Sequence, residues 1–155
     1  MRSLITKGIG MLAVAALLVP GSAMAMLELD LGFDPTEVCP GDDVQFFFSL
    51  ENIGDEAEMV EMTVMVTFDD FEIGPITGTF ELAAGEEVTK EIGLMVPPPT
   101  PPGTLTIYAS ATDSDGTVED TAELTINDCR GANQSANPRA LLNDFRKALG
   151  SIGLR

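Results

Sequence analysis

Apolar and polar residues alternate along most of the chain, which is the pattern of β-strands with one buried and one solvated face. Between Leu27 and Phe33, leucine and phenylalanine residues are separated by acidic residues and glycine. The same alternation recurs at residues 44–51, 60–68, 88–96, 105–111 and 118–126. Residues 77–82 make a weaker strand, and a short edge segment fits residues 69–75. Together these segments predict about seven short strands.

Turn-forming residues separate these segments. They lie at Asp34-Pro35, Pro40-Gly41, 52–55, Ala84-Gly85, 97–103 and 113–116. Short strands joined by such turns, with no helical stretch between them, predict an all-β sandwich of Greek-key type. A jelly roll or a small barrel is the alternative. In either case Phe46 and Phe48 belong to the core, because they share the apolar face of their strand.

The first 25 residues have the layout of a secretory signal peptide. Arg2 and Lys7 give a positive start, residues 9–20 are an apolar run, and Ala23-Met24-Ala25 matches a cleavage site. The alternative is a membrane anchor, which needs about 20 apolar residues rather than about a dozen. We therefore expect export, with residues 1–25 removed and a soluble protein acting in the periplasm or outside the cell.

Charge divides the remaining chain into an acidic body and a basic tail. Residues 26–129 hold 24 acidic residues and one basic residue, Lys90. Residues 130–155 hold five basic residues and one acidic residue, Asp144. Such a body repels nucleic acid and anionic lipid, which excludes both as its partners. High solubility or life in salty water is the alternative explanation of the acidity.

Cys39 and Cys129 are the two cysteines of the chain. An even count in an exported protein predicts a disulfide. The lack of histidine and of a C-x-x-C spacing argues against a metal held by this pair. Closing a loop of about 90 residues would stabilise the fold by roughly 4–5 kcal/mol on the chain-entropy account.

The turns of the body carry a resemblance to a known family. They read Pro40-Gly41-Asp42, Leu50-Glu51-Asn52-Ile53-Gly54, Leu82-Ala83-Ala84-Gly85-Glu86, Pro102-Gly103-Thr104 and Asp113-Ser114-Asp115-Gly116. This pattern resembles bacterial immunoglobulin-like domains of the adhesion-related class, the CARDB and DUF11-like group. The resemblance covers residues 27–128, within a predicted domain of residues 26–129. It implies an immunoglobulin-like sandwich without enzymatic activity, which serves as a spacer or adhesion module.

The same resemblance implies where the ends of the strands lie. In this topology the first strand runs beside and parallel to the last one, so Cys39 and Cys129 would fall at the same end of the sandwich. Three loops, at residues 52–58, 83–87 and 113–116, would gather at the opposite end.

Seven carboxylates lie in these three loops, and four of them are the candidate calcium ligands, namely Asp55, Glu56, Asp113 and Asp115. Calcium prefers oxygen ligands of this kind, and Asp113-x-Asp115-Gly116 matches part of a calcium-binding loop. That loop lacks its third and its distal ligand positions here. The alternative is that these residues only form a good hairpin turn. The sequence indicates no other cofactor.

Catalytic chemistry has little support in the sequence. The chain has no histidine, and a disulfide would leave no free thiol. The paired acids Asp42-Asp43 and Asp69-Asp70 are adjacent, so on a strand the members of each pair would point to opposite faces. Neither pair could then face a substrate across a cleft. We predict that the protein is not an enzyme.

Residues 130–155 are predicted to form a basic linker and an amphipathic helical tail. Residues 131–136 are the linker, Asn137 is an N-cap and Pro138 is the first helical residue. The helix, which Gly150 would end, carries the candidate partner-binding residues Leu141, Leu142, Phe145, Arg146, Lys147 and Leu149. Its apolar face could dock on its own domain, join a neighbouring subunit or rest on an anionic membrane, or the tail could stay disordered.

Phe47 and Met65 are the candidate partner-binding residues of the body. Both are apolar at positions that face away from the predicted core. Together they would form an apolar patch, which soluble monomers seldom leave uncovered. A neighbouring loop or the tail could cover it instead.

These observations predict a non-enzymatic, exported interaction module that binds an envelope or extracellular protein or a polysaccharide. One alternative is a structural subunit of an extracellular or periplasmic assembly, which self-associates through the tail. A second alternative is a small calcium-dependent binding protein.

Overall fold

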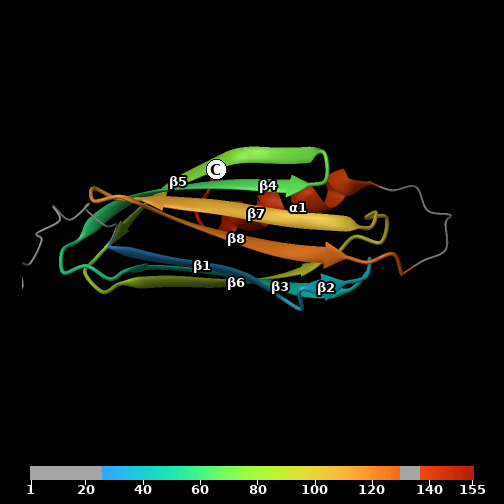
Figure 1. Ribbon diagram of the computed structural model, residues 1–155, viewed down its shortest axis with the longest axis horizontal. Coiled ribbons are helices and arrows are strands. Elements are labelled where there is room, and N and C mark those ends of the chain that lie inside the picture. The colour runs from blue at the N-terminus through green and yellow to red at the C-terminus, as the bar shows by residue number, and fades with distance from the viewer. Residues whose placement is uncertain (1–25, 130–136) are drawn as a thin grey trace, which may run out of the picture.

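The computed structural model describes residues 26–129 and 137–155 as eight strands and one helix (Figure 1). The predicted signal peptide and linker lie outside these residues. The elements are β1 (Leu27–Asp34), β2 (Glu37–Val38), β3 (Asp43–Asn52), β4 (Glu58–Phe68), β5 (Phe71–Leu82), β6 (Glu87–Met95), β7 (Gly103–Thr112), β8 (Thr117–Ile126) and α1 (Pro138–Ser151).

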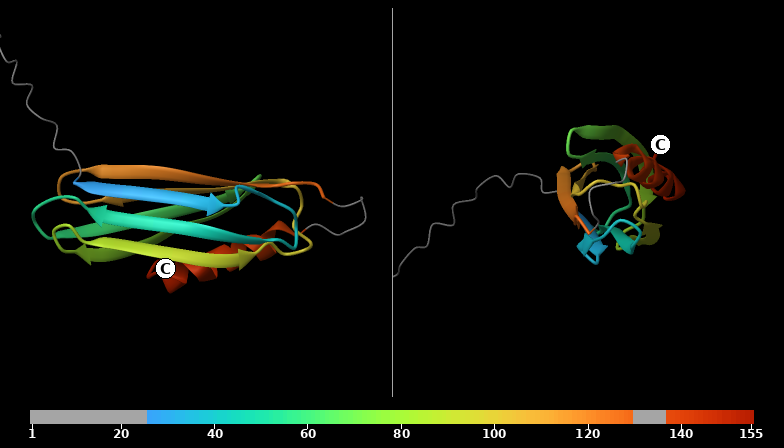
Figure 2. Two further views of the ribbon diagram at one scale, coloured as in Figure 1. Left: turned by 90° about the horizontal axis from the view of Figure 1, so that it is seen from below. Right: turned by 90° about the vertical axis from the view of Figure 1, so that its right-hand side faces the viewer.

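The strands form two sheets that pack face to face (Figure 1, Figure 2). One sheet has the order β1-β3-β6 and the other has the order β2-β8-β7-β4-β5. Side chains alternate between the buried interior and the outer faces, as the period of two predicts. Phe46 and Phe48 are each 1% exposed and lie in the core. The prediction of an all-β, immunoglobulin-like Greek-key sandwich is therefore confirmed.

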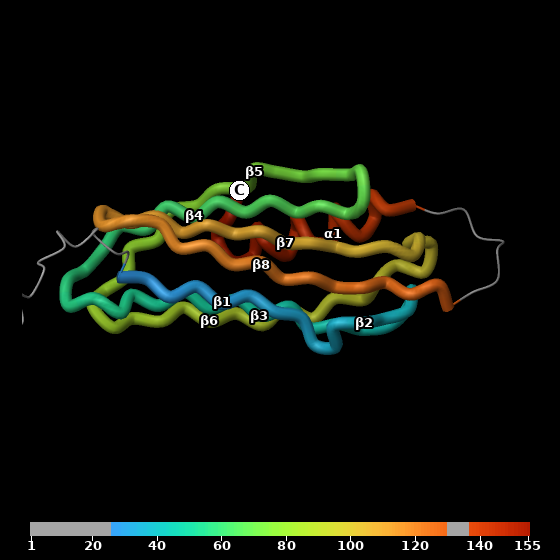
Figure 3. Tube along the Cα trace, in the orientation of Figure 1, coloured from blue at the N-terminus to red at the C-terminus, as the bar shows by residue number. Residues whose placement is uncertain are grey.

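The first predicted strand is divided between the two sheets (Figure 3). β1 pairs antiparallel with β3, whereas the two residues of β2 pair parallel with β8. Pro35 lies between them and lacks an N–H group for a ladder, which explains why pairing stops there. The first strand thus lies beside the last one, as predicted, and ladder pairs with β8 form at Glu37 and Val38.

β5 is longer than the two weak segments that the sequence indicates. It is a continuous edge strand of 12 residues that pairs with β4. The register shifts opposite Gly74 and Pro75, and Gly74 has a φ of 130°. This irregularity interrupts the alternation of apolar and polar residues, which is why the sequence pattern divides the strand in two.

Asp120 of β8 binds a backbone N–H group at the edge of the smaller sheet. It occupies an inward position of β8, and its Oδ2 accepts a hydrogen bond from the N–H of Leu31 at 2.7 Å. A strand edge with free N–H groups is a template for unwanted pairing. This contact occupies one such group on β1 and ties the two sheets together.

The helix α1 lies along the side of the sandwich between the edge strands β5 and β6 (Figure 2). Its N-cap is Asn137, as predicted, and the Asn137 side chain accepts a hydrogen bond from the N–H of Arg139. Leu141 and Phe145 are fully buried. The ring of Phe145 lies 5.7 Å from that of Phe33 and 6.1 Å from that of Phe46.

The tail therefore docks on its own domain. This corrects the assignment of Leu141, Leu142, Phe145 and Leu149 as partner-binding residues, because the same chain buries all four to 2% exposure or less. The helix supplies the apolar side chains that fill the gap between two sheets whose edges do not meet on this side.

The residues after the helix continue along β5. Leu154 is buried, and Arg155 and Thr77 exchange two backbone hydrogen bonds of 2.9 and 3.0 Å. A Cβ on Gly78 would lie 2.9 Å from the carbonyl oxygen of Gly153, so glycine allows this close approach. The helix ends at Ser151, one residue beyond the Gly150 stop that the sequence indicates.

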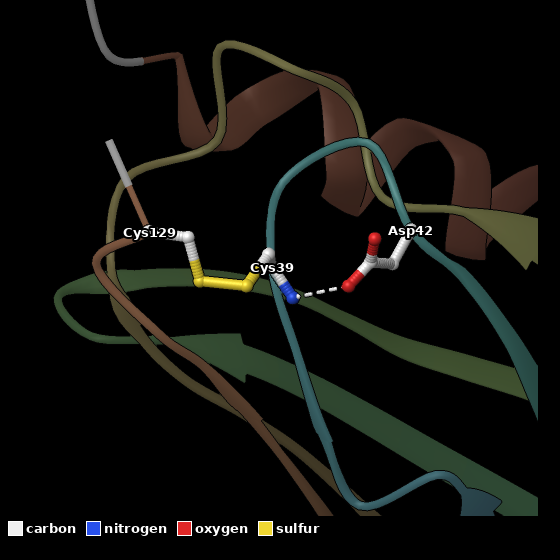
Figure 4. The surroundings of a disulfide bond; sticks show 3 residues. All are labelled: Cys39, Asp42 and Cys129. Carbon is white, nitrogen blue, oxygen red and sulfur yellow. Dashed lines mark hydrogen bonds between the residues drawn. A yellow bond between two sulfur atoms is a disulfide. The ribbon is translucent and has the colours of Figure 1, made fainter. Parts of the chain in front are cut away.

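Cys39 and Cys129 form a disulfide at the end of the sandwich where β2 and β8 finish (Figure 4). Their Cα atoms are 5.7 Å apart. The N–H of Cys39 also donates a hydrogen bond of 2.8 Å to Oδ2 of Asp42, which holds the turn that leads into β3. Both the predicted pairing and its predicted position agree with the structure.

Candidate functional site

The two predicted surface residues of the body lie on different faces. Phe47 is on β3, in the three-stranded sheet, and Met65 is on β4, in the five-stranded sheet. Both point outward, as the alternation predicts, so the width of the sandwich separates them. The predicted common patch of Phe47 and Met65 is therefore wrong. Alternation fixes the direction of a side chain within a strand but does not say which sheet the strand joins.

The outer face of the three-stranded sheet is acidic. Its outward residues include Glu28, Asp30, Asp34, Glu51, Glu87 and Glu91. Phe47 is paired with Gly32 on one side and Glu91 on the other, and its ring lies against Gly32. Hydrogen bonds from Ser49 and Thr89 lower the pKa of Glu87. A strongly charged face of this kind favours solubility.

The outer face of the five-stranded sheet has a wider uncharged centre, which spans two neighbouring strands. The outward residues here are Thr63, Met65 and Thr67 on β4 and Thr104, Thr106, Tyr108, Ser110 and Thr112 on β7. We call these eight residues the hydroxyl face. Met65 lies opposite Tyr108 in the ladder, and Thr67 lies opposite Thr106. The hydroxyl face is bordered by the acidic residues Glu61, Glu119 and Glu123.

Tyr108 lies diagonally across from Glu119 of the neighbouring strand β8. Their hydrogen bond raises the pKa of Tyr108, with smaller contributions from desolvation and from the negative charge of Glu119. The folded state therefore favours the protonated phenol. The stabilising contribution is present at neutral pH and is lost as the pH rises through the pKa of Tyr108.

Replacing Glu119 by alanine, which removes the hydrogen-bond acceptor and the charge together, is expected to lower the pKa of Tyr108 toward its ordinary value of 10.0. Tyr108 is the only tyrosine and the chain has no tryptophan, so phenolate absorbance during an alkaline titration reports this one group. Glu123→Ala is the control, because it removes the same charge from the same strand without removing the hydrogen bond. Equal shifts in the two variants would show that the hydrogen bond is not the cause.

The loops at the far end of the sandwich meet around Asn52, which is fully buried. Its side-chain amide donates to the carbonyl oxygens of Glu56 and Leu82, and its Oδ1 accepts from the N–H of Gly54. Its backbone is hydrogen-bonded to Gly85 and Glu86. In the sequence Asn52 stands out only as part of a turn motif, and the structure shows that it joins two of the three loops.

The four predicted calcium ligands are not assembled around one point. Asp55, Glu56 and Asp115 border a small hollow of about 90 Å³, but Asp113 does not. Oδ1 of Asp113 instead accepts hydrogen bonds from the N–H groups of Asp115 and Gly116. Among residues 26–129 and 137–155, no group of three or more acidic, cysteine or histidine side chains could hold a metal ion. Asp113 thus stabilises its own turn, as the alternative reading expects.

Arg146 and Lys147 lie on the exposed side of α1, as predicted. With Arg155 they border a hollow of about 340 Å³ over Ile76 and Leu154. The position of Arg155 near them could not be predicted, because the return of the chain along β5 leaves no signal in the periodicity. In the part of the chain that the structure describes, no helix is long and apolar enough to span a membrane.

No protein-family model and no curated protein matches the chain. Among solved structures, an alkylpurine DNA glycosylase from Pseudomonas fluorescens matches with a TM-score of 0.48 and 14% identity, over 67% of this chain and 31% of the glycosylase. A FixG-related protein from Vibrio parahaemolyticus matches with a TM-score of 0.45 and 13% identity, over 67% of this chain and 99% of that one.

A CARDB domain from Pyrococcus furiosus, solved in complex with di-metal ions, is also similar. Its TM-score is 0.43 and its identity 16%, over 66% of this chain and 88% of that one. The chain spans less than a third of the glycosylase. An enzyme and a CARDB domain thus match the chain with similarly low TM-scores and identities. These similarities assign neither a function nor a partner to this chain.

Proposed function

We propose that this protein is a non-enzymatic, exported interaction module that binds a protein or a polysaccharide through the hydroxyl face. The observation that carries the proposal is the absence of charge from the eight outward residues 63–67 and 104–112 of β4 and β7. The whole chain has a net charge of −17, yet this uncharged area extends over two neighbouring strands.

The chemistry of the hydroxyl face suits binding. Interface centres are depleted of charged residues and enriched in tyrosine and methionine, with a polar rim around them. The Met65–Tyr108 pair and the bordering acids follow this arrangement. Neutral hydroxyl groups also cost less to desolvate than carboxylates do. The Tyr108 ring offers apolar surface to a sugar ring or an aliphatic side chain, while threonine hydroxyls donate and accept hydrogen bonds.

The residue types available support binding rather than catalysis. The chain has no histidine, and both cysteines are in the disulfide. A disulfide is also compatible with an oxidising compartment outside the cytoplasm. A subunit that self-associates through the apolar face of the tail has less support, because the same chain buries that face.

Site-specific photo-cross-linking in exporting cells tests the proposal. A photoreactive residue in place of Ser110, on the hydroxyl face, is expected to form an adduct that protease or glycosidase digestion identifies as protein or polysaccharide. Ser49 is the matched control, because it is equally half-buried at the centre of the acidic outer face. Tyr108→Ala is expected to reduce the Ser110 adduct. Adducts at Ser49 alone, or equal adducts at both positions, would contradict the proposal.

A further inference from the structure

The basic residues of the tail form a separate surface on this acidic protein. Arg139, Arg146 and Lys147 of α1 and Arg155 beyond it are all exposed. We call these four residues the cationic stripe. None of them forms an ion pair with any residue that the structure describes. Each of these side chains is therefore free to form a close ion pair with a bound anion.

The helix geometry makes this surface long and narrow. Arg139, Asn143, Arg146 and Gly150 follow one another at intervals of four, three and four residues, so they lie on one side of α1. At 1.5 Å per residue, the distance along the helix from position 139 to position 150 is roughly 16 Å. Acidic groups lie beside the stripe, with Glu72 near Arg139 and Asp144 on the side of β6.

Three of the four cations meet at one end of the stripe. Arg146, Lys147 and Arg155 border the hollow of about 340 Å³, whose floor includes Ile76 and Leu154. The two backbone hydrogen bonds between Arg155 and Thr77 fix the position of the Arg155 main chain. Arg139 borders a second hollow of about 420 Å³ beside Phe71 and Leu142. An anionic group would thus find several cations in the first hollow and one in the second.

The width of the stripe indicates which kind of anion fits. A membrane surface or a second copy of the chain is broad, so it would also approach the acidic outer face beside β6 and the body's 24 carboxyl groups. A single polymer chain can follow α1 without meeting them. We propose that the cationic stripe binds an anionic polysaccharide, with one acidic group held by Arg146, Lys147 and Arg155. This surface is distinct from the hydroxyl face and does not depend on its function.

Binding of oligogalacturonate, a linear polysaccharide of carboxylate-bearing sugars, to the full chain tests the proposal by titration calorimetry. The wild-type protein is expected to bind it more weakly as salt rises, and to leave neutral dextran unbound. The double variant Arg146→Gln with Lys147→Gln should lose affinity by about tenfold or more, because charge-assisted hydrogen bonds are removed. Arg139→Gln should have a smaller effect, because it borders the hollow with a single cation.

Lys90→Gln is the matched control, because it removes an exposed cation from β6, outside the stripe. It should bind oligogalacturonate like the wild type. All these side chains are exposed, so unchanged melting temperatures should show that each variant is folded. Equal losses in Lys90→Gln and the double variant would overturn the proposal, as would an unaffected double variant or equal binding of dextran. Failure to bind oligogalacturonate while phosphatidylglycerol vesicles bind through Arg146 and Lys147 would overturn it in favour of a membrane.

Discussion

Replacing Phe145 by alanine is expected to lower the free energy of unfolding by about 3–5 kcal/mol, the usual cost of removing a buried phenylalanine ring. Phe145 is fully buried, and its ring packs edge-on against those of Phe33 on the edge strand β1 and Phe46 on the central strand β3 of the small sheet. The loss combines the transfer of the ring to water with the cavity that it leaves. Chemical denaturation followed by circular dichroism measures it.

Asn143→Ala is the control for this substitution, because Asn143 is exposed on the same helix. Its effect should stay within about 0.5 kcal/mol, as for most surface substitutions. If Phe145→Ala were as mild as Asn143→Ala, the helix would be an appendage that packs weakly on a sandwich stable without it. A large loss in a single cooperative transition would show that α1 belongs to the folding unit.

The strands could be predicted from the sequence because each has one buried face. Val60 to Phe68 on β4 shows this most clearly, since its apolar side chains at alternate positions are all 0–1% exposed. Burial of a strand on one side leaves a local signal of period two. The same signal correctly placed Phe46 and Phe48 inside and Phe47 outside.

The packing of segments that are far apart in the sequence leaves no such local signal. Phe47 and Met65 both point outward, but only the strand order shows that they lie on different sheets. The helix was correctly predicted from Asn137 onward, yet periodicity could not choose between docking on its own domain and binding a partner. That choice depends on the gap between β5 and β6, which tertiary packing creates. The hydroxyl face was also missed, although the alternate threonines of β7 are visible in the sequence.

Threonine has a strong preference for strands, which is why the pattern attracted no functional interpretation. What distinguishes the hydroxyl face is its setting. Its eight residues lie on two paired strands at the centre of a sheet, while acidic residues lie at the start of β4, on the neighbouring strands β5 and β8, in loops and on the other sheet. The absence of charge becomes informative only once neighbouring strands are known.

Replacing both Cys39 and Cys129 by alanine is expected to lower the free energy of unfolding by roughly 4–5 kcal/mol, because the disulfide closes a long loop in the unfolded chain. The two residues are 90 positions apart, so the bond restricts most of the body. The native state should lose order as well. β2 has only two residues and pairs with β8 by a short parallel ladder, which is marginal without another constraint.

Equilibrium denaturation of the double variant measures this loss. Wild-type protein in reducing buffer is the control, since breaking the bond without changing the residues should give nearly the same midpoint. Hydrogen exchange should show the additional effect on β2, with faster exchange at the N–H of Asn127, which donates to the carbonyl of Val38, than at the N–H groups of β7. A loss below about 1 kcal/mol would mean that β1, β8 and α1 already hold this end of the sandwich together, and that the bond adds little to the packing of the core.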